Sequence, residues 1–563
     1  MDENASARPL PVLTVRGPWN WDEVISGVAS SALLEALAEA ITSRRWFGSK
    51  ARAIESLGLV DAVAVSSVAR LLLLQIRFSL GSQDIYQVPL AFAEGPSRST
   101  PVARDMAAWI RVESEDGVPL GFLCDALDVP DYCNRLLALF TSADTLVGAA
   151  GTLVPRQTSS FESLRGPSDE GLTPRAVLTE QSNSSVIYGE RLILKVFRRV
   201  ERGLNPDIEI SAYLTQRRFA NTPALAGSLE YRGLQQEHWA LGMLQALVPN
   251  QGDAWHFTVD WLTKLSLALA ERPDSSKGVP APPSQGICRA AGFPVPTDAR
   301  AAFGEFLAKG ELLGKRTAEM HLALASDPKP PAFAPEPFSA ADRREYFRRC
   351  AAEARSTFEL LRHNVQKLAI PVAERARRVA ALEGAALARF ARSAEDAVVV
   401  NKIRCHGDYH LGQVLVAGGD FMIVDFEGEP ARSIDERRQK QLALRDVAGM
   451  IRSLHYASCT AAAARRTPSA PDTGDMARWM HSWFAWTSVS FLAAYLRTAG
   501  DAHFVPKPLE QLEALLECCL LEKAMYELRY ELNNRPNWVY LPLAALEELL
   551  DRAGHDTGRT DSE

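Results

Sequence analysis

Two neighbouring polar stretches decide the fold of this chain. The first reads CHGDYHLGQVL at residues 405–415, and the second reads IVDFEGEP at residues 423–430. An apolar run ends at each polar cluster, which predicts two short strands that carry polar loops at their tips. These loops are where we expect the chemistry of the molecule.

The order of the polar residues in these stretches is typical of phosphoryl transfer. That reaction needs a carboxylate beside the attacking hydroxyl and oxygen ligands for the Mg²⁺ ion that neutralises the phosphates. Asp408 supplies the carboxylate, and Gln413 and Asp425 supply two ligands. The same spacing occurs in the kinase pattern HRDxxxxN followed by DFG, with Gln here in place of Asn and Glu in place of Gly. A solvated loop that happens to contain Asp and His is the alternative, and the number of matching positions disfavours it.

Further side chains of these loops have candidate roles. We count His406 among the catalytic residues, where its place before Asp408 predicts that it holds the loop backbone. Glu427 either orders metal-bound water or contacts an acceptor hydroxyl. Asp446, at the entry to a helical pattern, is expected to bind backbone amides of the catalytic loop. The predicted transfer is direct and in line, with Asp408 as the base.

Size and composition restrict the class of protein. A chain of 563 residues is too long for one hydrophobic core, so two to four structural units are expected. A formal net charge of -7 argues against a general binder of nucleic acid or anionic membranes. The first eleven residues lack a secretory pattern, and no apolar run is long enough for a membrane span. The eight cysteines are scattered without a C-x-x-C pair, which fits a reducing, cytoplasmic location.

The pattern along the chain predicts three domains. Helical spacing over 19–40, alternating apolar runs over 57–93 and a helix over 132–140 predict an α+β cap domain at residues 1–165. Strand patterns predict a small nucleotide-binding lobe at 166–250, and helical patterns a catalytic and acceptor-binding lobe at 251–563. The basic and aromatic cluster at 44–52 is either a phosphate or sugar contact or a solvated face pinned by a packed Trp.

The predicted small lobe contains candidate groups for a nucleotide. Residues 177–197 read as strand, polar turn, strand, short turn and strand. The polar turn has no GxGxxG pattern, but its small side chains and backbone N–H groups could cap phosphate oxygens. These turn residues are Ser182, Asn183, Ser184 and Ser185.

A lysine within an apolar strand is the second nucleotide candidate. Lys195 would be costly there unless its ammonium meets a carboxylate or a phosphate. Glu209, on the next predicted helix, is the expected partner, as in the ion pair that aligns ATP in kinases. A strand-edge lysine that points to water is the alternative. The backbone near Val248 is expected to face the adenine edge.

A late helix offers a candidate wall for the acceptor. The pattern over 509–533 is helical, and one half of it is apolar core. Its polar and aromatic half suits a sugar, because Tyr and Trp rings stack on sugars and carry polar groups. An ordinary core or surface face is the alternative. The candidate residues are Lys523, Tyr526, Tyr530 and Trp538.

At this point the sequence resembles a known family. The chain is similar to the maltokinases, bacterial enzymes of the aminoglycoside-phosphotransferase and protein-kinase-like superfamily. The matching segments span nearly the whole chain, and the run from 406 to 453 is long enough to be specific. They are 45–50, 181–185, 194–199, 249–255, 316–322, 406–415, 425–430, 436–440, 444–453 and 522–538.

The resemblance implies a fold and an activity. The implied fold is a bilobal, protein-kinase-like α+β fold with an N-terminal α+β cap domain. The implied reaction is ATP- and Mg²⁺-dependent phosphorylation of maltose at its anomeric hydroxyl, giving maltose 1-phosphate for α-glucan and glycogen synthesis. It also implies association with trehalose synthase, Lys195 as a contact for ATP phosphate and residues 523–538 as a maltose wall. Residues 1–45 and the loops 271–300 and 326–337 look longer than a minimal member needs.

Other functions remain open from the sequence. One is a kinase of another small hydroxylated molecule, such as an aminoglycoside or another sugar. An acidic acceptor pocket would favour a cationic aminoglycoside, whereas the Lys-Tyr-Tyr-Trp set favours a neutral sugar. A catalytically dead nucleotide sensor or partner of trehalose synthase is a different class, and the presence of Lys195, Asp408 and Asp425 speaks against it.

Overall fold

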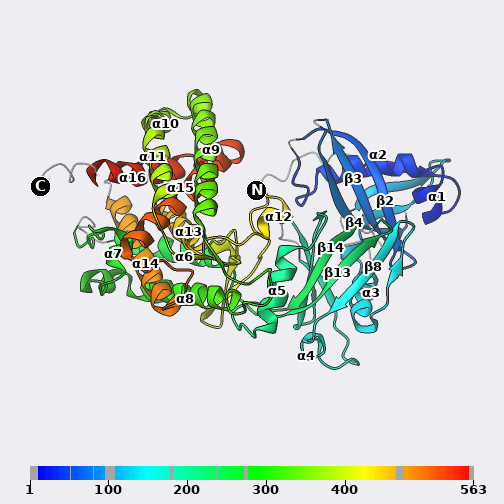
Figure 1. Cartoon of the computed structure of the whole chain (residues 1–563). Helices are drawn as coiled ribbons and strands as arrows, with labels where there is room; N and C mark the ends of the chain where they lie inside the picture. The colour runs from blue at the N-terminus through cyan, green and yellow to red at the C-terminus, as the bar shows by residue number, and fades with distance from the viewer. Residues whose placement is uncertain are drawn as a thin grey trace, which may run out of the picture. The chain divides into compact units, whose positions relative to one another are not determined.

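The computed structural model divides into two compact units, Met1–Val248 and Pro249–Glu563. It describes residues 10–556 except 51, 80, 96–107, 178–181, 236, 272–276 and 464–474. The first unit contains two large sheets, and the second is mainly helical (Figure 1). The division falls close to the predicted lobe boundary after residue 250, while the separation of a cap from a small lobe at residue 165 stays a prediction.

The first sheet of the N-terminal unit is almost entirely antiparallel. Its order is β1 (Val12–Val15), β5 (Ala108–Ser114), β6 (Pro119–Asp125), β4 (Gln83–Glu94), β3 (Ala69–Phe78) and β2 (Ile54–Ala64), and β12 (Arg199–Val200) pairs with β4. Alternate residues of β3 serve different cores, as the two-residue period of a strand requires. Leu72 and Leu74 pack with α2 (Ser30–Thr42), whereas Leu71 and Leu73 share a core with the second sheet.

The helix predicted over 19–40 is interrupted in the structure. It consists of α1 (Trp21–Ser26) and α2, separated at Gly27. Glycine is a poor helix former, and a Cβ at this position would lie 2.7 Å from the carbonyl oxygen of Glu23. The cluster at 44–52 is mainly structural where it is described: Trp46 and Phe47 are buried, and Arg52 is paired with Asp84 at 2.9 Å.

The second sheet carries the predicted nucleotide groups. Its order is β7 (Leu146–Val147), β8 (Gly151–Gln157), β13 (Leu225–Gly233), β14 (His238–Ala246), β11 (Leu192–Val196), β10 (Ser184–Tyr188) and β9 (Pro174–Val177). The helices α3 (Pro130–Ser142), α4 (Phe161–Arg165) and α5 (Pro206–Gln216) complete the unit. Strands β7 and β8 precede residue 165, so part of the predicted cap segment belongs to this sheet.

The two sheets are joined by the chain itself. After β11 the chain enters the first sheet as β12, and the backbone N–H of Gln87 on β4 donates to the carbonyl of Arg198 at 2.8 Å. The buried side-chain amide of Gln87 donates to the carbonyls of Phe197 and Leu241. The buried Arg198 also forms an ion pair with Asp125 of β6.

The C-terminal unit is a helical domain with a small hairpin. Its hairpin consists of β17 (Val414–Ala417) and β18 (Asp420–Ile423), and β15 (Glu336–Pro337) pairs with β16 (Asn401–Lys402). The helices are α6 (Ala254–Ala270), α7 (Gly286–Ala290), α8 (Thr297–Leu324), α9 (Ala340–Asn364), α10 (Ile370–Ala381), α11 (Glu383–Glu395), α12 (Ile434–Arg437), α13 (Leu444–Ala463), α14 (Asp475–Ala499), α15 (Leu509–Asn534) and α16 (Tyr540–Asp556).

Close packing of α8 on α14 organises the interior of this unit. Gly314 of α8 faces α14 so closely that an added Cβ would lie 2.0 Å from the carbonyl oxygen of Phe491. Only glycine permits this close approach of the two helices. The same packing brings His321, which follows Gly314 in α8, beside Tyr495 of α14. The position of His321 matters for the candidate site.

Candidate active site

The β17–β18 hairpin brings the two predicted Mg²⁺ ligands to one end. The strands pair from Val414 opposite Ile423, and the backbone N–H of Val424 donates to the carbonyl of Gln413 at 3.0 Å. Asp425 follows directly, with a φ of 69°, a left-handed conformation that is uncommon outside glycine and often occurs at functional sites. Amide and carboxylate oxygens are ligands that Mg²⁺ accepts, so these residues fit the ion, although their role stays a prediction.

Asp446 at the start of α13 holds the catalytic loop, as predicted. Its Oδ2 accepts a hydrogen bond from the backbone N–H of His406 at 2.7 Å, and its Oδ1 accepts from Gly407 at 3.0 Å. His321 Nε2 lies 3.0 Å from Oδ2, and His321 Nδ1 lies 2.9 Å from the Tyr495 hydroxyl. Burial alone would raise the pKa of Asp446. The contacts of its carboxylate with His321 and with the loop amides have a larger, opposite effect, so the pKa is lowered.

His406 ties the catalytic loop to the hairpin. Its Nε2 donates to the backbone carbonyl of Val424 at 2.9 Å, directly before Asp425. The ring is buried and lies against Tyr409 and Phe426, with centroids 5.2 and 4.9 Å away. These contacts agree with the predicted role of His406 in holding backbone, and its place among the catalytic residues stays a prediction.

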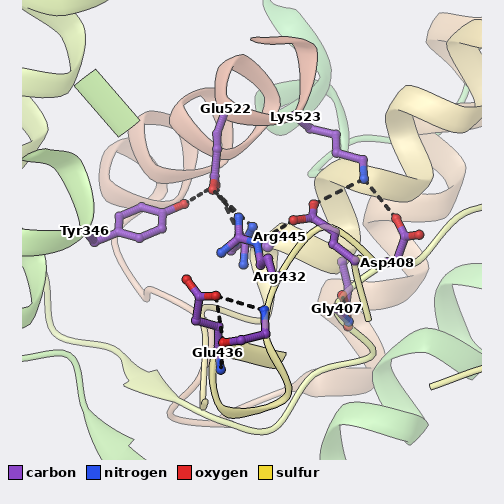
Figure 2. A network of polar contacts seen from close by, with 11 residues as sticks. Tyr346, Gly407, Asp408, Arg432, Glu436, Arg445, Glu522 and Lys523 are labelled. Atoms are coloured by element: carbon purple, nitrogen blue, oxygen red, sulfur yellow. Dashed lines mark hydrogen bonds and ion pairs between the residues drawn. The ribbon is translucent and has the colours of Figure 1, made fainter. Parts of the chain in front are cut away.

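Lys523 of α15 lies against Asp408, the predicted base. Its Nζ is 3.1 Å from Asp408 Oδ1 and 3.6 Å from Glu429 Oε1 (Figure 2). Burial alone would raise the pKa of Asp408, but the charge and hydrogen bond of Lys523 oppose burial, and the pKa is lowered. Burial alone would also lower the pKa of Lys523, but Asp408 and Glu429 raise it. Both groups of the pair are therefore ionised at neutral pH.

The ion pair continues into a wider buried network that sequence reasoning missed. Glu429 Oε2 lies 2.5 Å from Arg432 Nε. Glu522, the neighbour of Lys523, binds Arg445 through two contacts of 3.1 Å and accepts a hydrogen bond from the Tyr346 hydroxyl (Figure 2). Glu429, Arg445 and Glu522 lie in segments that resemble the maltokinases, but nothing in their spacing distinguished them from surface charges.

The other predicted acceptor residues form a row beside Lys523. Lys523 Nζ lies 4.7 Å from the ring centroid of Tyr526, which stacks on Tyr530 with centroids 6.5 Å apart. Arg535, which we had not singled out, lies 5.2 Å from the rings of both Tyr530 and Trp538. The four predicted residues therefore occupy one continuous row, and its use as a sugar wall stays a prediction.

In the N-terminal unit, Lys195 has a carboxylate partner that the sequence did not identify. Its Nζ lies 2.9 Å from Oδ2 of Asp207, a buried residue in the first turn of α5. The expected partner, Glu209, is in the same turn, and its contact with Lys195 stays a prediction. The expectation of a carboxylate beside this lysine is confirmed.

The predicted phosphate turn is shorter than expected. Strand β10 begins at Ser184, so the turn residues that the structure describes are Ser182 and Asn183. Ser185 is buried opposite Lys195, and Ser184 Oγ accepts a hydrogen bond from Arg198 Nε at 2.8 Å. Two of the four small residues are therefore part of the strand, where Ser184 pairs with Val196 and Ser185 with Lys195 of β11.

Val248, the predicted adenine-facing position, follows the end of β14. It is the last residue of the N-terminal unit. Its contact with a nucleotide stays a prediction.

Comparison with known proteins gives one family model and several relatives. Residues 41–127 match the maltokinase N-terminal cap domain. The chain is 27% identical over 402 residues to a glucosamine kinase of Mycolicibacterium smegmatis, covering 70% of this chain and 83% of the relative. It is also 27% identical over 390 residues to a glucosamine kinase of Streptacidiphilus jiangxiensis, covering 67% and 73%.

Solved structures share the fold. A glucosamine kinase in complex with glucosamine, ADP and inorganic phosphate matches with a TM-score of 0.56 and 22% identity, over 91% of this chain and 98% of that one. A glucosamine kinase structure described as crystal form B matches with a TM-score of 0.59 and 22% identity, over 95% of this chain and 100% of that one. These findings confirm the resemblance to maltokinases in the N-terminal cap and an α+β fold that the chain shares with kinase structures. Within the described residues, no helix is long and apolar enough to cross a membrane.

Proposed function

We propose that this chain is an ATP-dependent sugar kinase that phosphorylates maltose at its anomeric hydroxyl, giving maltose 1-phosphate for α-glucan synthesis. The observation that carries the proposal is the position of Asp408, paired with Lys523 on a loop fixed by Asp446, next to a hairpin that presents Gln413 and Asp425. This combination supplies a base and two oxygen ligands, which are the protein groups that phosphoryl transfer requires.

Each residue has a defined task in this mechanism. Asp408 accepts the proton of the sugar hydroxyl as that oxygen attacks the γ-phosphorus of ATP. Gln413 and Asp425 would hold Mg²⁺, which when bound neutralises charge on the phosphates. In the N-terminal unit, Lys195 would bind a phosphate while Asp207 keeps its ammonium oriented. His406 and Asp446 hold the loop backbone, so the base stays in place between turnovers.

The charge of the candidate acceptor wall favours a neutral sugar. An amino sugar carries an ammonium, which binds best to a carboxylate without another cation. The acidic residues of α15 next to the aromatic row already have cationic partners: Glu522 binds Arg445, Glu527 binds Arg452 at 2.6 Å, and Glu531 binds Arg535 at 2.8 Å. The stacked tyrosines suit the faces of a disaccharide.

Glucosamine is the second candidate acceptor. The named relatives are glucosamine kinases, and one was solved with glucosamine bound. The family model at 41–127 instead points to maltokinases. Glu427, which is partly buried in the loop after β18, is the acidic side chain that we assign to recognition of an amino group in that case. Association with trehalose synthase stays a prediction that co-purification of the two proteins would test.

A panel of acceptors decides between these functions. The purified chain is mixed with ATP, Mg²⁺ and maltose, glucose, glucosamine or an aminoglycoside, and ADP release is measured. The position of the phosphate on the product is then read by ³¹P NMR. We expect the highest kcat/KM with maltose and phosphate on the anomeric oxygen. A higher value for glucosamine would replace the sugar assignment, and no ADP release with any acceptor would refute the kinase.

A further inference from the structure

Lys523 lies between two carboxylates that come from different loops. Its Nζ is 3.1 Å from Asp408 Oδ1 and 3.6 Å from Glu429 Oε1, and the Glu429 side chain is only 4% exposed. The ammonium therefore donates a hydrogen bond to Asp408 and forms an ion pair with Glu429. The Lys523 and Asp408 side chains are only 17% and 21% exposed, and a partly buried position strengthens the attraction between their charges. Lys523 is therefore held in place by the protein before any sugar arrives.

Glu429 is itself fixed from its other side. Its Oε2 binds Arg432 Nε at 2.5 Å, and Arg432 Nη2 lies 3.8 Å from Glu522 Oε1. Glu522 in turn binds Arg445 of α13 (Figure 2). The charges alternate along this chain of contacts, so each ion has an opposite neighbour. Moving Lys523 away from Asp408 would disturb several buried pairs, which makes Lys523 a rigid neighbour of the base.

These contacts make the two oxygens of Asp408 unequal. Oδ1 accepts a hydrogen bond from Lys523, whereas Oδ2 lies 4.0 Å from His410 Nε2, beyond hydrogen-bond distance. His410 Nδ1 accepts the backbone N–H of Gly412 at 3.1 Å, so a neutral His410 carries its proton on Nε2. Oδ2 is therefore the better placed oxygen to receive a proton.

We propose that Lys523 is a positioning residue that holds Asp408 Oδ1 and leaves Oδ2 to take the proton of the acceptor hydroxyl. This inference rests on the proposed kinase function. In the step, the hydroxyl proton moves to Oδ2 and the hydroxyl oxygen forms a bond to the γ-phosphorus of ATP. The bond from that phosphorus to the bridging oxygen breaks, and its electron pair leaves with ADP.

Glu429 has a specific task in this arrangement. When Asp408 becomes protonated it loses its charge, and a buried lysine without a counter-ion would then be costly. Glu429 keeps the charge of Lys523 balanced through the step. The arrangement also assigns Lys523 a different role from that of the aromatic row, since its ammonium serves the base and not primarily the sugar.

Substitution of Lys523 separates this role from a sugar contact. The groups that face Asp408 are Lys523, His410 and His406, and Lys523 also faces Glu429, Tyr526 and Glu527. In Lys523→Met, kcat is expected to fall about 10²-fold because the base is misplaced. The acid limb of the profile of kcat/KM against pH is expected to move to higher pH, because the Lys523 ammonium no longer lowers the pKa of Asp408. The KM for the sugar should change little.

Two further variants make the result specific. Lys523→Arg keeps the charge, so its acid limb should stay near the wild-type position even if kcat is reduced. Lys507, which pairs with Asp501 at 2.7 Å on the surface of the same unit, gives the matched control Lys507→Met, expected to behave as the wild type. An unchanged acid limb in Lys523→Met together with a large rise in the sugar KM would overturn the proposal and make Lys523 a sugar contact.

The test of Lys523 does not depend on which sugar is the natural acceptor. The pH profiles use whichever sugar the wild type phosphorylates best, so a wrong sugar changes the substrate and not the comparison. If the chain phosphorylates none of these sugars, urea unfolding without substrate still tests the ion pair between Lys523 and Asp408. The urea midpoints of Lys523→Met, Asp408→Asn and the double variant should be non-additive if the pair is formed. Additive shifts would overturn the pairing regardless of activity.

Discussion

Replacement of Asp446 by Asn tests how strongly the catalytic loop depends on one buried carboxylate. In the structure, Oδ2 contacts the N–H of His406 and Nε2 of His321, and Oδ1 contacts the N–H of Gly407. Asn has nearly the same shape but only one acceptor oxygen. Whichever way the amide turns, its NH₂ group faces at least one backbone N–H, and a donor then meets a donor.

The size of the effect follows from these contacts. A hydrogen bond to a charged group contributes about 1.5–3 kcal/mol, and the variant loses one of them. We therefore expect Asp446→Asn to reduce the free energy of unfolding of the C-terminal unit by about 2 kcal/mol. Asp446→Ala removes all three contacts and should cost about 3–5 kcal/mol, as for other broken buried pairs. Because Gly407 directly precedes Asp408, kcat should fall in both variants.

Urea unfolding and steady-state kinetics are the assays for these variants. The change in urea midpoint at a constant slope reports the loss of stability. Asp435→Asn is the matched control, since Asp435 is exposed in the first turn of α12 and should change neither stability nor kcat appreciably. Wild-type stability in Asp446→Ala would refute the reasoning, because it would mean that the loop amides find equivalent partners without this carboxylate.

The same residue predicts a pH dependence with a definite sign. Although burial opposes ionisation, the contacts with His321 and the loop lower the pKa of Asp446 in the folded protein. Its contribution to stability is then fully present above the pKa of the unfolded chain, about 3.9, and is lost as pH falls through the folded value. Urea midpoints of the wild type should converge on those of Asp446→Ala in this acidic range, and a constant difference would contradict the assignment.

Three further substitutions test other parts of the molecule. Asp408→Asn should reduce turnover by about 10²–10⁴-fold while the Kd for ATP, measured by calorimetry, stays near that of the wild type; retained turnover would remove Asp408 as the base. Asp425→Asn should raise the Mg²⁺ concentration needed for half-maximal rate, and chelation of Mg²⁺ should abolish activity in wild type and variant alike. Arg198→Met leaves the carboxylate of Asp125 buried without its guanidinium, so the N-terminal unit should lose about 3–5 kcal/mol, measurable as a lower Tm.

Spacing within one segment carried the most reliable information in the sequence. Asp408, Gln413 and Asp425 lie in one short segment, and the pairing of β17 with β18 is enough to bring Gln413 and Asp425 to one end of the hairpin. The anchoring of the loop by Asp446 was also predictable, because an acid at a helix start beside polar loop amides has few other uses. These local relations do not depend on how distant helices pack.

Contacts between distant segments could not be read in the same way. Asp207 and Glu209 both lie in the first turn of α5, and only the position of α5 on the sheet puts Asp207 next to Lys195. The residue types of Lys523 and its aromatic neighbours suggested a polar wall. The contact of Lys523 with Asp408, however, joins residues more than a hundred positions apart, so it depends on the packing of α15 against the catalytic loop.

The path of the chain through β12 limits how the molecule can be dissected. A fragment that begins after residue 165 would lack β8, which pairs with β13, and β7, which pairs with β8. It would also lack β4, which pairs with β12. Such a fragment would expose an unpaired strand edge and the hydrophobic side of a sheet, and aggregation is the expected outcome. The segment that matches a cap model therefore shares strand pairing and core residues with the rest of the N-terminal unit, so a cut at residue 165 would divide one packed body.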